Sequence, residues 1–267
     1  MLELLDYQFF RHALMGVLIL SIGAGVLGTY IVTRRMVSIC GGITHACFGG
    51  LGLGYFCGFS PIVSAMFFAI GSALGVQWLS WRGKVREDSA IAVVWALGMA
   101  VGVFFVFVTP GTVPELNSFL FGNILTITTS TLWTFGIYTA ALVVLMSVAY
   151  RRVVAVAFDR DFATVIGLRV KLLSTLLTVM VAVGIVLMIR CVGIMLLMSM
   201  LTMPQLTAEL FCRRYGAMMR GAIVVSSISS VGGLLLSTVV DVPTAVFIVF
   251  LQVAIYAVAA VVRTLTR

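Results

Sequence analysis

The histidine at position 45 has the residue type and the surroundings that suit metal chemistry. It lies within the apolar segment SICGGITHACFGGLGLGYFCG, residues 38–58, with Gly41 four residues before it and Gly49 four residues after it. On a helix both glycines lie one turn from His45, so we expect the imidazole to face a narrow gap. A neutral imidazole is a common transition-metal ligand, and ionisable groups inside membranes usually line a substrate path or pair with a partner. We therefore predict that His45 lies on a transport path; the alternative is a hydrogen-bonded packing residue.

Two cysteines near this histidine, Cys40 and Cys47, raise the alternative of a mixed metal site. At about 100° per residue the two thiols share one stripe of a helix, and His45 points roughly 140° away from that stripe. All three could face one ion only if the helix were broken, so this is the weaker hypothesis. The chain has five cysteines, an odd number without a C-x-x-C pair. This pattern argues against a disulfide framework and favours free thiols that pack as small apolar groups.

The segment that carries His45 must lie in a bilayer. Of the 267 residues, 62% are hydrophobic and 10% are charged, whereas a soluble domain is about half apolar and about a quarter charged. This composition excludes a soluble enzyme, and the long Val, Ile, Leu and Phe runs exclude a disordered chain. These runs do not alternate with polar residues, which favours helices over a β-barrel.

We predict an all-α polytopic membrane protein with eight to nine transmembrane helices, forming a single domain over residues 1–267. A crossing needs about 20 apolar residues. The segment 192–206 is short and ends near Pro204, so it decides between eight and nine. The expected spans are 12–33, 39–58, 61–81, 89–109, 131–150, 173–190, 192–206, 221–240 and 243–262.

The basic residues indicate the orientation in the membrane. The net charge of +8 could suggest nucleic acid, but 15 of the 17 Lys and Arg residues fall in alternate gaps between the expected spans. Basic loops face the cytoplasm, so we expect the N-terminus outside, the C-terminus inside and no nucleic-acid partner. The 15 residues are Arg34, Arg35, Arg82, Lys84, Arg86, Arg151, Arg152, Arg160, Arg169, Lys171, Arg213, Arg214, Arg220, Arg263 and Arg267.

One cytoplasmic stretch, PQLTAELFCRRYGAMMR at 204–220, mixes apolar and charged residues. As a helix it would offer a partner an apolar centre with arginines at the rim, a common composition for an interface. We predict a docking surface there with Glu209, Leu210, Arg213 and Arg214 at the contact. The alternative is a helix end that carries only the positive-inside charge.

Motifs for enzymatic chemistry are missing from the sequence. The only lysines, Lys84 and Lys171, stand outside any G-x-x-x-x-G-K-[ST] context, so the chain has no P-loop for ATP. Neither G-x-S-x-G nor H-E-x-x-H occurs. We therefore expect no enzymatic activity and no permanently bound cofactor.

Five segments, in order along the chain, resemble the permease subunits of bacterial ABC transporters for zinc, manganese and iron. RRMVSICGGITHACFGGLGLG is similar to the family's R-R-M…G-D-x-x-x-H-A…G segment, and EDSAIAVVWALGMAVG to its E-D…G stretch. LNSFLFGNILTIT resembles Y-L-F-G-D-[IL]-L, and FDRDFATVIGLRV resembles D-x-x-x-A-x-x-x-G. VGIMLLMSMLTMPQLTAELF is similar to V-G-x-L-L…L-x-x-P-x-x-[TA]-A.

The sequence departs from the family at two acidic positions. Gly41 replaces the Asp that would share the face of His45, and Asn123 replaces the Asp of F-G-D. A site with one imidazole and no carboxylate should disfavour a hard ion such as Mn²⁺ more than Zn²⁺ or Fe²⁺.

The resemblance implies a permease in the bacterial cytoplasmic (inner) membrane that imports a divalent metal ion. It implies a second copy of the chain, a cytoplasmic ATPase subunit and an external metal-binding protein as partners. An ion-coupled secondary transporter is the competing hypothesis, which inverted repeats and intramembrane acids would favour. The sequence shows no convincing repeat, and no acid lies well inside an expected span.

Overall fold

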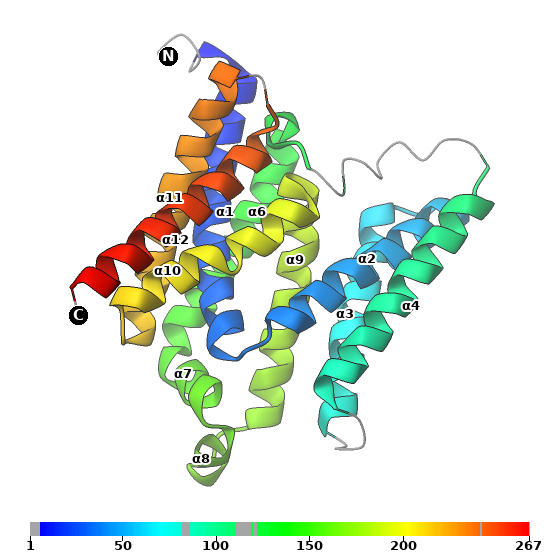
Figure 1. The fold of residues 1–267 in the computed structure, drawn as a ribbon. Coiled ribbons are helices and arrows are strands. Elements are labelled where there is room, and N and C mark those ends of the chain that lie inside the picture. Colours follow the sequence, from blue (N-terminus) through cyan, green and yellow to red (C-terminus); the bar gives the residue numbers. More distant parts are fainter. Residues whose placement is uncertain (1–5, 82–85, 111–118, 120–121, 241, 267) are drawn as a thin grey trace. The chain divides into compact units, whose positions relative to one another are not determined.

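The computed structural model describes residues 6–81, 86–110, 119, 122–240 and 242–266. Within these ranges it contains helices and no strand, which confirms the predicted all-α class (Figure 1). The elements are α1 (Gln8–Thr33), α2 (Val37–Cys57), α3 (Pro61–Trp81), α4 (Glu87–Val108), η2 (Ile124–Thr126), α6 (Thr129–Val148), α7 (Tyr150–Phe158), α8 (Arg160–Val165), α9 (Val170–Met200), α10 (Met203–Phe211), α11 (Tyr215–Val240) and α12 (Thr244–Leu265).

Eight segments of the described chain are long and apolar enough to cross a membrane, within the predicted range of eight to nine. Seven of them agree with the predicted spans to within about two helical turns. The eighth, Val170–Phe211, has 42 residues and covers two predicted spans, 173–190 and 192–206. Since one crossing takes about 20 residues, this segment is long enough for two.

The chain stays helical through residue 192, just past the approximate boundary that we expected between these two spans. Gly193 then interrupts α9 with φ 73° and ψ 172°, a conformation that glycine adopts at little cost. A second break at residues 201–202 precedes α10, which has Pro204 in its first turn. The region therefore has two breaks, one at Gly193 and one before α10. The orientation of the termini stays a prediction.

The helices form two compact units, each built from separate pieces of the chain. Unit 1 contains Met1–Arg34, Asn117–Phe158 and Met188–Arg267. Unit 2 contains Arg35–Leu116 and Asp159–Leu187. Helix α9 therefore begins in unit 2 and ends in unit 1.

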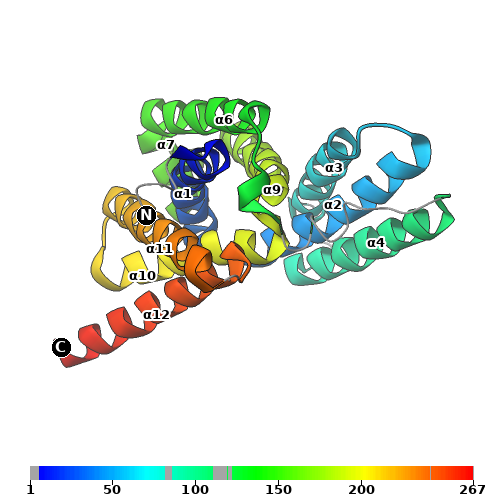
Figure 2. The same ribbon diagram turned by 90° about the horizontal axis from the view of Figure 1, so that it is seen from above.

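Helix α1 is the centre of unit 1. It packs against α6, α10 and α11, which surround it when the unit is seen from above (Figure 2). The side chains of Leu20, Leu27 and Ile31 are fully buried. A hydrogen bond of 3.3 Å from the Ser21 hydroxyl to Ser230 joins α1 to α11. Such contacts between helices replace the hydrophobic driving force that a bilayer does not provide.

A buried glutamine supplies a hydrogen bond that the backbone cannot make at the break before α10. Pro204 has no N–H to donate to the carbonyl of Met200, four residues earlier. The Nε2 of Gln205 donates to that carbonyl at 3.3 Å and to the carbonyl of Ala24 on α1 at 2.8 Å. A Cβ on Gly28 would collide with this amide, so the glycine makes room for it. The side chain of Gln205 therefore links the break before α10 to the central helix α1.

Unit 2 is built around α2, which lies between α3 and α4 (Figure 2). A stripe of small residues on α2 packs backbone against backbone, as expected for membrane helices. A Cβ on Gly50 would lie 2.6 Å from the Cα of Ala65 on α3, and one on Gly54 would lie 2.8 Å from the Cα of Pro61. The first part of α9 joins this unit through a 3.0 Å hydrogen bond from Gln77 Nε2 to Ser174.

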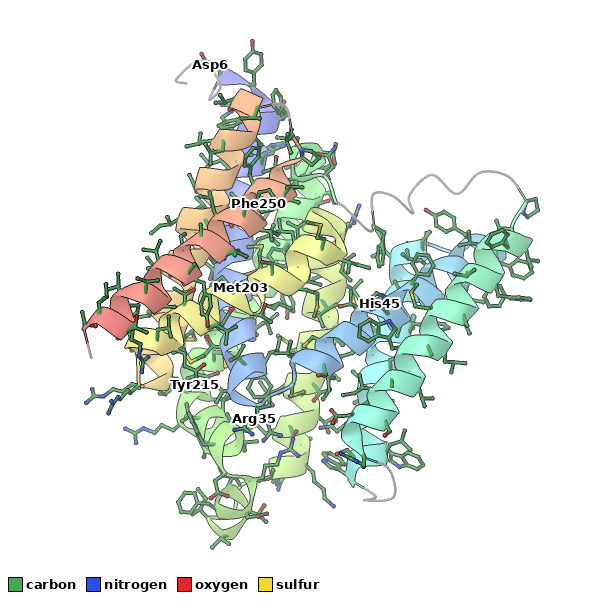
Figure 3. All side chains as sticks on the ribbon, in the orientation of Figure 1. Asp6, Arg35, His45, Met203, Tyr215 and Phe250 are labelled. Carbon is green, nitrogen blue, oxygen red and sulfur yellow. The ribbon has the colours of Figure 1, made fainter. Side chains whose placement is uncertain are left out.

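Three of the predicted basic gaps meet at one end of unit 1. Arg34, after α1, donates to the carbonyl of Val156 on α7 at 3.1 Å. The Tyr150 ring, beside Arg151, lies 6.1 Å from the ring of Tyr215, which follows Arg214. Tyr215 and Asp6 lie at opposite ends of the unit (Figure 3). Within unit 1, these basic gaps therefore lie at one end, as the prediction required. Residues 82–85 and 111–118, which fall in predicted loops, lie outside the described residues.

The stretch 204–220 is not the single helix that we expected. Helix α10 ends at Phe211, Cys212 has an extended conformation (φ −110°, ψ 122°), and α11 begins at Tyr215. The chain after α6 is also divided, into α7 and α8. Asp159 follows α7 and caps α8, because its carboxylate accepts a 2.9 Å hydrogen bond from the Phe162 N–H.

Candidate functional site

His45 lies on α2 in unit 2, where its ring contacts two side chains of α4 (Figure 3). The imidazole stacks on Trp95, with ring centroids 4.3 Å apart and an interplanar angle of 13°. Its Nδ1 lies 3.3 Å from the sulfur of Met99. Trp95 and Met99 are four residues apart, so they share one face of α4. His45 itself is half-buried, whereas its neighbours along α2 are buried.

The gap expected beside His45 is therefore occupied. A Cβ on Gly49 would lie 2.9 Å from the carbonyl oxygen of Gly98 and 3.2 Å from the Phe68 ring. Gly41 is buried as well. The neighbours that fill this narrow space come from α3 and α4, which a pattern on α2 alone cannot indicate.

Glycines on both helices make this close packing possible. A Cβ on Gly98 would lie 2.5 Å from the Cα of Ala46, and one on Gly52 would lie 2.5 Å from the carbonyl oxygen of Gly102. Gly98 and Gly102 form a G-x-x-x-G pair on α4. Small residues at this spacing let two membrane helices approach at the backbone. The positions of His45, Trp95 and Met99 follow from this contact.

The two cysteines lie in the packed part of α2. Cys40 and Cys47 are fully buried, and the Cys47 thiol donates to the carbonyl of Ile43 at 3.0 Å. All five cysteines are free, as predicted. Within the described ranges, no group of three or more His, Cys, Asp and Glu side chains converges on one point. The mixed His/Cys site stays an untested alternative.

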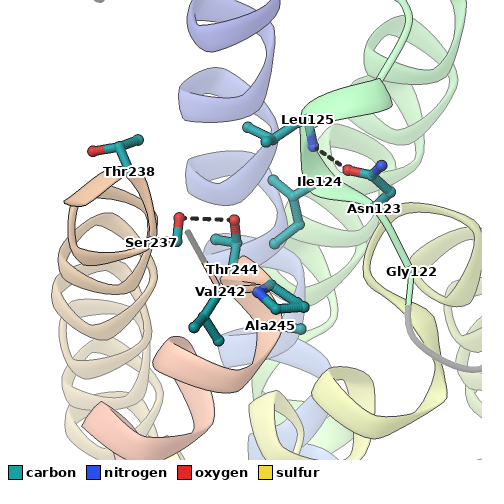
Figure 4. Close-up of a pocket in the computed structure, with 10 residues that line it drawn as sticks. Gly122, Asn123, Ile124, Leu125, Ser237, Thr238, Val242, Thr244 and Ala245 are labelled. Atoms are coloured by element: carbon teal, nitrogen blue, oxygen red, sulfur yellow. Dashed lines mark hydrogen bonds between the residues drawn. The ribbon is translucent and has the colours of Figure 1, made fainter. Parts of the chain in front are cut away.

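Asn123 belongs to unit 1, whereas His45 belongs to unit 2. Its side-chain oxygen accepts a 3.1 Å hydrogen bond from the Leu125 N–H and so caps η2. The residue lines a cavity of about 490 Å³ with Ser237, whose hydroxyl lies 2.9 Å from that of Thr244 (Figure 4). The lining residues that the structure describes are uncharged, and they are Gly122, Asn123, Ile124, Leu125, Ser237, Thr238, Val242, Pro243, Thr244 and Ala245.

The predicted docking residues lie where α10 ends in unit 1. Glu209, Arg213 and Arg214 are exposed, and Leu210 is half-buried. The guanidinium of Arg263, near the end of α12, donates to the carbonyls of Glu209 and Leu210. We call Glu209, Leu210, Arg213 and Arg214 the α10 surface. Hydrogen bonds from Arg263 fix the α10 surface to α12, and its three charged side chains are exposed.

Sequence reasoning missed Trp95 and Met99. The available signal was the sequence W-A-L-G-M-A-V-G at 95–102, where a G-x-x-x-G pair lies on the segment beside Trp95 and Met99. A glycine stripe on α2 needs a matching surface, and this pair on α4 provides it.

Comparisons with known proteins identify the family of the chain. The model of the ABC 3 transport family matches residues 6–263. The chain is 30% identical over 258 residues to a manganese transport system membrane protein of Halalkalibacterium halodurans, covering 96% of this chain and 88% of the relative. It is 31% identical over 259 residues to a probable iron transport system membrane protein of Haemophilus influenzae, covering 97% and 95%. PsaBC from Streptococcus pneumoniae in complex with Fab has a similar fold, with a TM-score of 0.85 at 24% identity over 96% of this chain and 94% of that chain.

Proposed function

Because this chain belongs to the ABC 3 transport family, we propose that it is the permease of an ATP-driven importer for a divalent transition-metal ion. The family match over residues 6–263 carries the proposal, because it includes nearly all of the eight candidate spans. Relatives named for manganese and iron transport support a metal as the substrate. Zinc, manganese and iron are the candidate ions. The family match does not favour an ion-coupled secondary transporter.

A separate ATPase subunit supplies the energy in this proposal. The sequence has no P-loop, so ATP must bind to another chain. The α10 surface supports an interface, because exposed arginines and an exposed carboxylate surround the half-buried Leu210. A second candidate contact is α8, whose Phe162 and Val165 are exposed outside the candidate spans.

Two further partners complete the proposed importer. An external metal-binding protein delivers the ion, and a second copy of the chain forms the other half of the permease. In unit 2, α3 and α4 leave most of their surface uncovered, with 22% and 17% of their apolar windows buried. Lipid and the second copy would cover such surfaces.

Uptake of radioactive Zn²⁺, Mn²⁺ and Fe²⁺ into proteoliposomes tests the proposal. Vesicles that contain the permease, its ATPase and the external binding protein should accumulate at least one of these metals only when ATP is present on the ATPase side. Permease alone should accumulate none. Uptake without the ATPase that stops when an ionophore collapses the proton gradient would instead show a secondary transporter.

Charge reversal tests the docking surface. Arg213→Glu with Arg214→Glu should abolish co-purification of the ATPase and leave the permease in the membrane. Phe162→Ala with Val165→Ala on α8 is the parallel variant, since it removes apolar contact area outside the α10 surface. Loss of co-purification with the α8 pair alone would move the contact to α8.

A further inference from the structure

Met99 places a thioether sulfur directly beside the imidazole of His45. The Nδ1 and the sulfur are 3.3 Å apart, and Trp95 covers one face of the ring at 4.3 Å. Both His45 and Met99 are half-buried, unlike the fully packed residues around them on α2. The pair combines a borderline ligand with a soft one.

The separation of these two atoms suits one shared ion. Zinc lies about 2.1 Å from an imidazole nitrogen and about 2.3 Å from a thiolate sulfur, and at such distances these two atoms would subtend an angle of about 100° at a shared ion. That value is close to the tetrahedral angle that zinc prefers. Two protein ligands leave the remaining positions for water, and a weakly held ion can move on.

The backbone contact between α2 and α4 holds the pair in place. Ala46, next to His45, packs against Gly98, next to Met99, so closely that no Cβ fits on Gly98. A ligand pair on two such closely packed helices is set by the helices themselves rather than by loops. This arrangement provides the preorganisation that a metal site requires.

The chemistry of the pair selects the class of metal. Gly41 has no side chain, so α2 offers no carboxylate on the face of His45. Carboxylates suit Mn²⁺, whereas imidazole and thioether suit later and softer ions. We propose that His45 and Met99 together bind the transported ion and make the permease prefer a zinc-like ion over Mn²⁺. This inference rests on the proposed function, since it assigns the substrate class of the same path.

Removal of the sulfur tests the inference. The variants are Met99→Leu, which keeps an apolar side chain, and Met66→Leu on α3 of the same unit as the matched control. Each full-length permease is measured with its ATPase in proteoliposomes for Zn²⁺ and Mn²⁺ uptake. Each is also titrated in detergent with Zn²⁺ against a chelating dye. We expect Met99→Leu to weaken Zn²⁺ binding at least about tenfold, to leave Mn²⁺ uptake near wild type and so to lower the zinc preference.

The possible outcomes separate the two proposals. If the wild-type complex transports no metal with ATP, the proposed function fails. If it transports metal but Met99→Leu keeps the wild-type zinc affinity and zinc preference, the inference fails and Met99 only packs against the ring. Met99→Gln, which keeps the side-chain length without sulfur, replaces Met99→Leu if the leucine variant does not accumulate in the membrane. An equal effect of Met66→Leu would also overturn the inference.

Discussion

The backbone of Gly122 lies directly against the peptide bond between Val192 and Gly193. Both glycines have positive φ, 65° at Gly122 and 73° at Gly193. A Cβ on Gly122 would overlap the carbonyl of Val192 and the nitrogen of Gly193. The segment that precedes η2 therefore packs against the break in α9, within unit 1. The contact and the positive φ favour glycine at position 122, and the positive φ favours it at position 193.

Gly122→Ala should strongly reduce the amount of folded permease. The new Cβ meets both a disfavoured φ, which costs about 1–2 kcal/mol, and a backbone collision. Gly167→Ala separates the two effects, because Gly167 also has positive φ (81°) but has no atom within 4 Å of its Cβ position. Membrane levels and thermal unfolding in detergent measure the difference. Equal losses in the two variants would show that the collision is relieved.

Gly98→Ala should destabilise unit 2 and disturb His45. Its Cβ would lie 2.5 Å from the Cα of Ala46, so α2 and α4 must separate, at a cost of about 1–3 kcal/mol. Gly75→Ala on α3 has open space around its Cβ and should be neutral or stabilising by up to about 1 kcal/mol. Thermal unfolding of the purified permeases compares them. A Gly98→Ala protein as stable as Gly75→Ala would contradict the close packing.

His45→Ala should remove most metal uptake without lowering the amount of folded permease. Cys40→Ala and Cys47→Ala should transport nearly normally, because both thiols are buried on another stripe of α2 and Cys47 bonds to its own helix. Uptake in proteoliposomes, scaled to the permease content, measures all three. Normal uptake by His45→Ala would make the histidine a packing residue.

Labelling from either side of intact cells should give the orientation of the termini. In a Cys57→Ser background, which removes the exposed native thiol, Asp161→Cys on α8 should react only with a membrane-permeant reagent. Thr238→Cys, exposed near the end of α11, should react with an impermeant reagent added outside. These expectations follow from the positive-inside rule. The reverse pattern would place the N-terminus in the cytoplasm.

The sequence was sufficient to predict most spans, because a crossing needs only length and apolar composition. It was not sufficient to predict the break at Gly193 or the turn at 212–214. A glycine can be helical or adopt positive φ with the same neighbours in sequence, and the contact between Gly193 and Gly122 joins segments far apart in the chain. The helix end at Cys212 has no Gly or Pro to indicate it.

Only the part of the candidate site that lies on α2 was predictable from the sequence. The apolar run and the small-residue stripe placed His45 on a packed helix, and the structure has that helix between α3 and α4. Its partners Trp95 and Met99 depend on how α4 is rotated about its own axis, which the backbone contact at Gly98 sets. Asn123 was chosen by resemblance, and its local role is to cap η2.

The stacking of His45 on Trp95 gives the protein an optical reporter. Indole emission is sensitive to the charge and electronic state of a group in contact with the ring, and the imidazole lies 4.3 Å away. The other three of the four tryptophans, Trp78, Trp81 and Trp133, lie on α3 and α6. With phenylalanine at those three positions, all indole fluorescence comes from Trp95. The light emitted by such a protein would then follow the occupancy of His45 directly, without a dye or a radioactive ion.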